Sequence, residues 1–346
     1  RNNGGTGVYT ISGGSLTELI PGSRMIVGSS GTGTLNVSGT AQVRSLGSFQ
    51  VAENGSSVGT VNLDGGTITA PRVMGGAGFG TFNFNGGTLV AANGAQQDFM
   101  SGITTVNVKA GGAKINTGTN VVNVSQALLD GSGDGGLTKL GAGTLNLNGA
   151  NTYTGATAVN EGRLGGSGTI AGPVNVASGA GLAPGSTSGI GTLTINNALT
   201  LASGSTTFVD VSLDGGVPAS DEVTGLTSVS YAGTLVVSNV GTNALEAGSV
   251  FKVFNAASSS GNFTSVTVLP SGSATFNPAT GEVTITGTGS LAVGSATLQN
   301  GNLILTGEGG VPGTGYTWLT STNVADPLAS WTTNSTGVFD SNGAFS

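Results

Sequence analysis

Apolar and polar residues alternate in short runs that recur along the first third of the chain. The runs GVYTI, GTLNV, GTVNL, GTFNF and TTVNV begin at residues 7, 33, 59, 80 and 104, so they recur after 26, 26, 21 and 24 residues. Alternation over so few residues indicates β-strands. A period of this length is typical of solenoids.

Two further short apolar runs follow each of these segments, separated by glycine-rich corners. The second set is SGGSLT, SGTAQV, DGGTIT, NGGTLV and AGGAKI, and the third includes RMIVG, FQVAE, RVMGG and DFMSG. Three strands per repeat predict one coil of a parallel β-helix, with the right-handed winding that parallel crossovers prefer. We therefore predict an all-β chain whose residues 1–185 form a right-handed parallel β-helix with coils of about 24 residues.

The alternation also predicts which side chains point into this helix. Flanking apolar residues of LNV, VNL, FNF and VNV share one strand face and the central asparagine takes the other. The predicted inward residues are Leu35, Val37, Val61, Leu63, Phe82, Phe84, Val106 and Val108. The predicted outward amide column is Asn36, Asn62, Asn83 and Asn107. Stacked amides can hydrogen-bond from coil to coil, although asparagine is also simply tolerated on a wet strand face.

A resemblance to a known family rests on residues 135–164, GGLTKLGAGTLNLNGANTYTGATAVNEGRL. With its Leu-Thr-Lys, Gly-Thr-Leu, Asn-Thr-Tyr-Thr-Gly and Gly-x-Leu landmarks in order, this stretch resembles the autotransporter-associated β-strand repeat of secreted and surface proteins of bacteria. The resemblance implies an exported β-helical scaffold with no catalysis of its own. It places Tyr153 over a corner of one coil and Lys139 and Glu161 on the wet surface.

The pattern changes after residue 185, where longer alternating runs appear. Residues 186–288 are predicted to be a β-rich continuation or a capping domain, built either from broader coils or from a sandwich-like antiparallel unit. Residues 289–346 resemble the small C-terminal β-domain of exported proteins from Verrucomicrobia and related bacteria. Its last hairpin is unfinished, which makes Asn342, Gly343, Ala344 and Phe345 candidates for an edge that pairs with another subunit.

Composition and charge remove several functional classes. The chain has 346 residues, no Cys and no His, so it lacks disulfides, a cysteine nucleophile and the commonest metal ligand and general base. A net charge of -7 argues against nucleic acid and anionic membranes as partners, and no apolar run is long enough to insert in a membrane. The predicted partners are copies of the same chain, with surface glycans as a second class.

One loop has part of the pattern of a calcium site. Asp130, Ser132 and Asp134 occupy alternate positions before a glycine, as in calcium loops, but a distant bidentate glutamate is not evident. A structural turn is the favoured interpretation. We predict no other cofactor.

The densest acidic group is Asp210, Asp214, Asp221 and Glu222. Paired carboxylates could run glycosidase chemistry if they met in a cleft, but no aromatic platform for a sugar accompanies them, and solvated strand edges are the favoured interpretation. Arginines recur at equivalent positions of two coils, Arg24 and Arg72, with Arg44 elsewhere on its coil. We expect these arginines to be isolated surface residues.

These observations favour a non-enzymatic structural protein located outside the cell or on its surface. The leading hypothesis is a subunit of a surface filament or layer that assembles by end-to-end β-strand pairing. An adhesin or passenger domain that binds glycans as a monomer is the first alternative. A polysaccharide lyase or hydrolase on a β-helix is the second.

Overall fold

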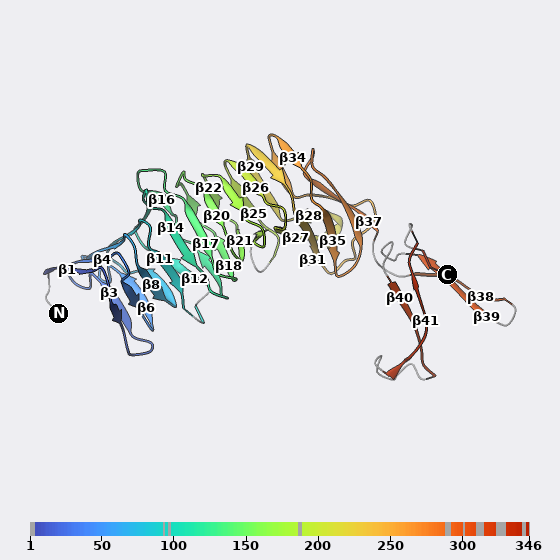
Figure 1. The fold of residues 1–346 in the computed structure, drawn as a ribbon, viewed down its shortest axis with the longest axis horizontal. Helices are drawn as coiled ribbons and strands as arrows, with labels where there is room; N and C mark the ends of the chain where they lie inside the picture. The colour runs from blue at the N-terminus through green and yellow to red at the C-terminus, as the bar shows by residue number, and fades with distance from the viewer. Residues whose placement is uncertain are drawn as a thin grey trace.

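The computed structural model describes residues 4–92, 94–95, 98–185, 189–287, 292–299, 302–308, 315–322, 330–340 and 344–345. It contains an elongated stack of β-coils that runs from the N-terminus to a small cap, followed by two β-hairpins (Figure 1). The predicted all-β solenoid is confirmed. Within the described residues, no helix has the length and apolar character needed to cross a membrane.

Each coil contributes one strand to each of three faces of the stack, and strands on one face pair in parallel. Sheet A covers the first face of the N-terminal coils, with β1 (Thr6–Ile11), β4 (Thr32–Val37), β7 (Val58–Leu63), β10 (Phe79–Phe84), β13 (Thr105–Val108) and β16 (Leu129–Asp130). In the later coils the first strand belongs to a separate sheet, sheet D. It is formed by β19 (Ala150–Asn151), β22 (Thr169–Ile170), β25 (Thr192–Ile195), β29 (Glu222–Leu226) and β33 (Phe254–Ala256).

The other two faces are continuous sheets. Sheet B is formed by β2 (Ser15–Thr17), β5 (Gln42–Arg44), β8 (Thr67–Ala70), β11 (Thr88–Ala91), β14 (Ala113–Asn116), β17 (Leu137–Leu140), β20 (Thr157–Val159), β23 (Val174–Val176), β26 (Ala198–Leu201), β30 (Ser228–Tyr231) and β34 (Ser259–Gly261). Sheet C is formed by β3 (Arg24–Val27), β6 (Ser48–Val51), β9 (Arg72–Gly75), β12 (Asp98–Ser101), β15 (Val121–Val124), β18 (Thr144–Leu147), β21 (Arg163–Gly166), β24 (Gly181–Pro184), β27 (Thr206–Ser212), β31 (Thr234–Asn239) and β35 (Ser265–Leu269). The 11 strands of sheet B mark 11 coils, a stack of roughly 50 Å at about 4.8 Å per coil.

The coil stack continues well past residue 185. β24 pairs in parallel with β27, β27 pairs with β31, and β31 pairs with β35. Of the two alternatives for residues 186–288, continued coils therefore account for most of the segment. Coil length varies around the predicted period, because Arg163 and its register partner Gly181 are 18 residues apart, whereas Thr234 and Ser265 are 31 apart.

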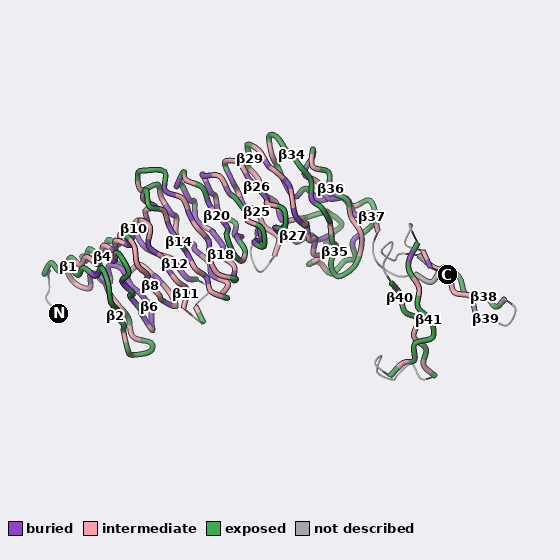
Figure 2. Tube along the Cα trace, viewed as in Figure 1, coloured by how far each residue is buried: buried purple, intermediate pink, exposed green. Residues whose placement is uncertain are grey.

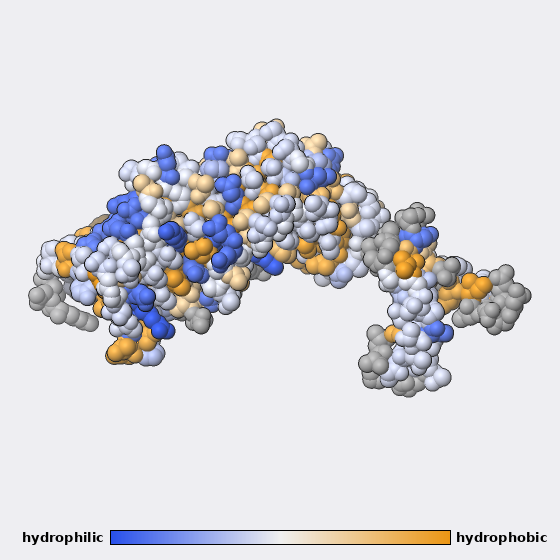
Figure 3. Space-filling model, viewed as in Figure 1, coloured by the Kyte–Doolittle hydropathy of each residue, from blue (hydrophilic) through white to orange (hydrophobic). Residues whose placement is uncertain are grey.

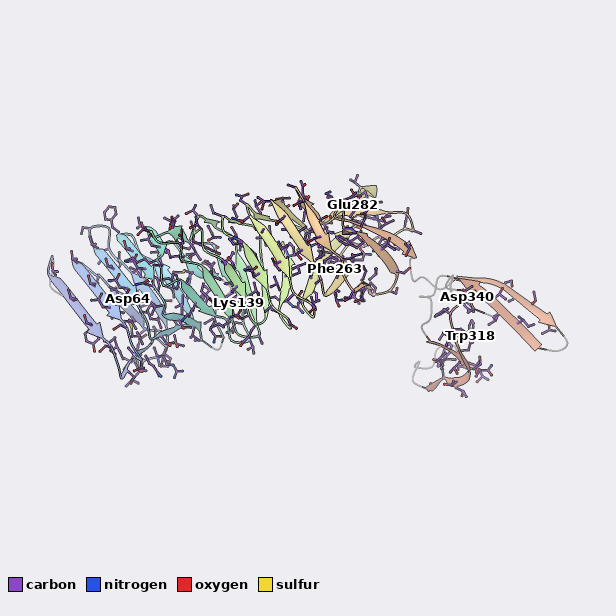
Figure 4. All side chains as sticks on the ribbon, turned by 45° about the horizontal axis from the view of Figure 1, so that its top comes forward. Asp64, Lys139, Phe263, Glu282, Trp318 and Asp340 are labelled. Atoms are coloured by element: carbon purple, nitrogen blue, oxygen red, sulfur yellow. The ribbon has the colours of Figure 1, made fainter. Side chains whose placement is uncertain are left out.

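A small antiparallel sheet covers the C-terminal end of the coils. It consists of β32 (Val250–Lys252), β37 (Glu282–Gly287) and β36 (Ser273–Asn277), in that order. Under it the rings of Tyr231, Phe254, Phe263 and Phe276 form a cluster with centroids 4.8 to 6.1 Å apart. Edge-to-face aromatic contacts of this kind add to the gain from burial. Figure 4 places Phe263 near this end of the stack.

Short elements and two hairpins complete the described chain. β28 (Ala219–Ser220) pairs antiparallel with β27, and η1 (Asp214–Gly216) is a single 3-10 turn. β38 (Ala292–Gln299) pairs with β39 (Asn302–Glu308), and β40 (Gly315–Thr320) pairs with β41 (Thr332–Val338), both antiparallel.

The core is a column of apolar side chains inside the stack, seen as alternating buried segments in Figure 2. All eight residues predicted to point inward from sheet A are at most 4% exposed. They form one cluster with the inward residues of the other sheets. A coil has no core without its neighbours, so its stability depends on stacking.

Candidate functional site

The asparagines of sheet A form a hydrogen-bonded column on the side of the strands opposite the core. Asn62 Nδ2 donates to Asn36 Oδ1 at 2.8 Å, Asn83 donates to Asn62 at 2.7 Å, and Asn107 donates to Asn83 at 2.8 Å. The column ends on Thr10, whose Oγ1 accepts from Asn36 at 3.1 Å. Such a chain of neutral amides links coils but offers no group for acid–base chemistry.

A second, shorter amide pair lies on sheet C and was missed by the sequence analysis. Asn146 Nδ2 donates to Asn123 Oδ1 at 2.8 Å, and Asn146 is only 3% exposed. The same apolar-Asn-apolar pattern, in VVNV and TLNL, was the signal available. The amide pairing therefore occurs on two faces of the solenoid.

Lys139 is fully buried, so its predicted position on the wet surface is wrong. Its register partners on sheet B are Ile115 and Val159, which are inward aliphatic residues. Strand alternation from Leu137 places Lys139 inside, even though a charge usually marks the surface. In Figure 4 it lies in the middle part of the coil stack.

The ammonium of Lys139 is held by backbone carbonyls. Nζ donates to the carbonyl oxygens of Gly141 at 2.6 Å, Leu140 at 3.0 Å and Glu161 at 3.1 Å. Burial lowers the pKa of Lys139 to about 8, against an opposing effect of the Glu161 charge. Glu161 is exposed, as expected, and its carboxylate accepts from Gly141 N at 2.8 Å. The ammonium has three N–H donors and donates all three to carbonyl oxygens. Because Glu161 lies on the following coil, this lysine joins successive coils.

Asn151 bridges the interruption between sheets A and D. Its Oδ1 accepts from Leu128 N at 3.1 Å, and its Nδ2 donates to Gly149 O and Thr169 O, both at 3.0 Å. Asn151 is 1% exposed. Because β16 and β19 do not pair as strands, this side chain supplies contacts that the backbone ladder supplies elsewhere.

Tyr153 lies in the core beside the same interruption. The ring is fully buried, and its hydroxyl is 2.6 Å from Thr157 Oγ1. Burial raises the pKa of Tyr153 far above its usual value, so the phenol stays neutral. Lys139, Asn151 and Tyr153 are thus buried polar residues of the two successive coils that contain β16 to β21. We call these two coils together the polar coil.

In the loop considered for calcium, two carboxylates accept hydrogen bonds from other groups of the chain. Asp130 Oδ1 accepts from Ser132 N at 3.1 Å, and Asp134 Oδ1 accepts from Thr154 Oγ1 at 3.1 Å. Ser132 and Asp134 have φ of 68° and 53°, the left-handed conformation of tight turns. Over the described ranges, no three His, Cys, Asp or Glu side chains gather where they could hold a metal ion. The loop geometry is that of a turn.

The Asp221 side chain is hydrogen-bonded to the backbone of Asp210. Asp221 is 3% exposed, and its carboxylate accepts from Gly191 N at 2.7 Å and Asp210 N at 2.9 Å. Burial raises the pKa of Asp221 to about 6, with the Asp210 charge adding to the rise and the two N–H groups opposing it. Burial also raises the pKa of Asp210. The Asp221 carboxylate thus holds strand ends together.

The other two acidic residues are also engaged by the chain. Asp214 is exposed and accepts from the backbone N–H groups of Asn243 and Thr242, which lower its pKa. Burial raises the pKa of Glu222, and the Lys252 charge opposes that rise. Asp210 and Asp221 are therefore in contact, whereas Asp214 is held by a different segment, residues 242–243.

The arginines divide into paired and unpaired residues. Arg24 forms a salt bridge with Glu53 at 2.9 Å and donates to Gln50 Oε1 at 2.7 Å. Arg72 forms a salt bridge with Asp98 at 2.6 Å. Arg44 lines a shallow groove of about 330 Å³ with Pro71, Val90 and neighbouring residues.

The proposed inter-subunit edge is partly occupied by the chain itself. Asn342 and Gly343 lie outside the described residues. Phe345 pairs with Gly307, donating at 2.9 Å and accepting at 3.1 Å, and its ring is buried beside Tyr316 and Trp318. The N–H and C=O of Phe345 are therefore not available to another subunit.

The comparisons with known proteins concern the polar coil. The architecture is that of a β-helical scaffold. Residues 137–165 match the passenger-associated-transport-repeat family, over β17 to β21. The match includes Lys139, Asn151 and Tyr153 but covers a small part of the chain. A search of curated proteins finds no relative.

The repeat family indicates a passenger-type β-helical protein that is secreted or surface-exposed. This agrees with the resemblance drawn from the sequence of residues 135–164. The resemblance of residues 289–346 to exported proteins of Verrucomicrobia stays a prediction.

Proposed function

We propose that the protein is a non-catalytic structural protein that works outside the cell, as a subunit of a filament or layer. The observation that carries the proposal is the contrast between the two ends of the molecule. Over the described residues, the first strands of sheets A, B and C each pair with one neighbour only, and at the other end two β-hairpins follow the cap. The stack of coils lies between them (Figure 1).

The N-terminal end of the stack is apolar and uncovered in the described structure. β1, β2 and β3 are the terminal strands of sheets A, B and C. Tyr9 occupies an inward register position but is 52% exposed, and Leu16, Met25 and Leu35 line a groove of about 300 Å³ beside it. Figure 3 shows apolar residues on the surface of the N-terminal end. Strand edges of this type invite pairing with another chain.

The partner edge has to come from outside the coil stack, because the cap closes its C-terminal end. Val283 and Ile285 of the cap are at most 1% exposed. The hairpins β38–β39 and β40–β41 are two-stranded sheets in the described structure, and on β39 the outer edge is already paired with Phe345 at Gly307. Pairing of a hairpin edge with the N-terminal edge of the next copy is a head-to-tail contact, which propagates into open filaments.

Assembly is measured by light scattering and negative-stain microscopy of the untagged protein over a wide concentration range. We expect filaments that lengthen with concentration. Tyr9→Lys should abolish them, because a charge on an edge opposes strand addition. Phe79→Lys is the matched control, since Phe79 is 64% exposed on β10, away from the end. A wild-type protein that stays monomeric at every concentration refutes the proposal.

A further inference from the structure

An arginine and a phenylalanine from separate coils meet on the outer face of sheet C. The guanidinium carbon of Arg163, on β21, lies 3.7 Å from the ring centroid of Phe208, on β27. β24 lies between these two strands, so the two side chains contact each other across the outer face of β24. A cation over an aromatic face is attracted by the ring quadrupole, which holds the guanidinium against the ring.

Gly181 makes this arrangement sterically possible. It lies in register between Arg163 and Thr206. A Cβ at this position would lie 3.0 Å from Thr206 O, 3.2 Å from Arg163 Cγ and 3.3 Å from Phe208 Cε2. The absence of a side chain at Gly181 therefore leaves the space over β24 that Arg163 and Phe208 occupy.

The pair forms part of the wall of a shallow groove. Its other lining residues are small: Ala142, Gly162, Gly179, Ala180 and Thr206. The groove has a volume of about 260 Å³, enough for about one sugar ring by comparison with typical ligand pockets. A floor of glycine and alanine lets a ligand approach the backbone closely.

Arg163 is available to a ligand, in contrast to Arg24 and Arg72. Over the described residues its guanidinium forms neither a salt bridge nor a hydrogen bond within the chain. Arg163 is exposed. Of the nearby acids, Glu161 directs its carboxylate to Gly141 N, and Asp210 follows Phe208 on β27, where burial raises its pKa. The pair thus presents a pre-oriented cation in a chain of net charge -7.

We propose that this groove binds a carboxylate-bearing glycan, with Arg163 receiving the carboxylate. A guanidinium offers two parallel N–H groups that match a carboxylate. Stacking on Phe208 holds that fork in place, and the ring edge contacts sugar C–H groups. Because the groove is shallow and accepts about one sugar, the dissociation constant should be about 1 mM. This inference is independent of filament assembly.

The test uses tetragalacturonate and its methyl ester, which differ in charge but keep the sugar ring. We expect the ester to bind at least 10-fold more weakly in titrations followed by NMR. Arg163→Gln should weaken tetragalacturonate binding about 10-fold, and Gly181→Ala should weaken it by displacing the pair. Lys114→Gln removes the same charge from the exposed face of sheet B and should change binding less than twofold.

Three outcomes overturn the proposal. The first is no saturable binding by the folded wild-type protein. The second is equal affinity for the acid and its ester, because the carboxylate is then not recognised. The third is an equal loss in Lys114→Gln and Arg163→Gln, which assigns binding to overall charge. Circular dichroism of each variant establishes that it retains the fold.

Discussion

The first five coils and the polar coil solve the same stacking problem in different ways. In the first five coils, sheet A is a regular ladder, its asparagines lie on the face opposite the core, and the buried inward side chains of its strands are aliphatic or aromatic. In the polar coil, sheet A ends at β16 and sheet D begins at β19, each strand with two residues. Here a lysine, an asparagine and a tyrosine enter the interior.

The difference indicates where polar side chains contribute most to the stability of a solenoid. An outer amide adds a hydrogen bond to strands that are already paired, so its net contribution is small. A buried polar group that replaces missing backbone pairing leaves unsatisfied partners when it is removed, and these cost more. Substitutions should therefore be more damaging in the polar coil than in the column of sheet A.

The largest effect is expected for Lys139→Ala. It leaves a cavity in the sheet B column and removes the donor from three carbonyls. We expect a loss of about 4 kcal/mol in the free energy of unfolding of this region. Denaturant unfolding together with hydrogen exchange measures it. Lys114→Ala on the outer face should change stability by less than about 0.5 kcal/mol. A similar small change for Lys139→Ala would show that the buried ammonium is not a structural link.

The pKa of Lys139 sharpens the comparison further. The pKa is about 8 in the folded protein, below its value of 10.5 in the absence of these effects. The unfolded chain therefore binds more protons between these values, so this group adds stability as pH rises from 8 towards 10.5. Relative to Lys139→Met, the wild type should gain about 2 kcal/mol over that interval. A pH-independent difference between the two proteins would contradict the burial of the charged amine.

The second largest effect is expected for Asn151→Ala. The substitution leaves Leu128 N, Gly149 O and Thr169 O without their partner at the interruption. We expect a loss of about 3 kcal/mol and faster amide exchange at Leu128. Asn175→Ala, on the exposed side of β23, is the control and should be nearly neutral. Equal effects of the two substitutions would contradict the bridging role.

The alternation of apolar and polar residues predicted the solenoid, but it could not predict contacts between residues far apart in the sequence. The period and the alternation predicted the inward residues of sheet A and the side of the strand on which its asparagines lie. The same alternation places Lys139 inside, but its charge favoured the surface, because burial of a charge is costly unless partners are known. The cap cluster joins Tyr231 to Phe276, and the outer pair joins Arg163 to Phe208. No local pattern specifies such long-range pairs.

The smallest effect is expected for Asn62→Ala, in the middle of the sheet A column. The variant loses the hydrogen bonds to Asn36 and from Asn83, but the neighbouring strands stay paired through their backbones. Asn36 is half-buried, so its freed amide oxygen can bind water. The expected loss is therefore about 1 kcal/mol. Unfolding of Asn62→Ala and Asn151→Ala under the same conditions tests the comparison directly. If Asn62→Ala is the more damaging variant, the outer column is what holds the coils together, and the polar coil is secondary.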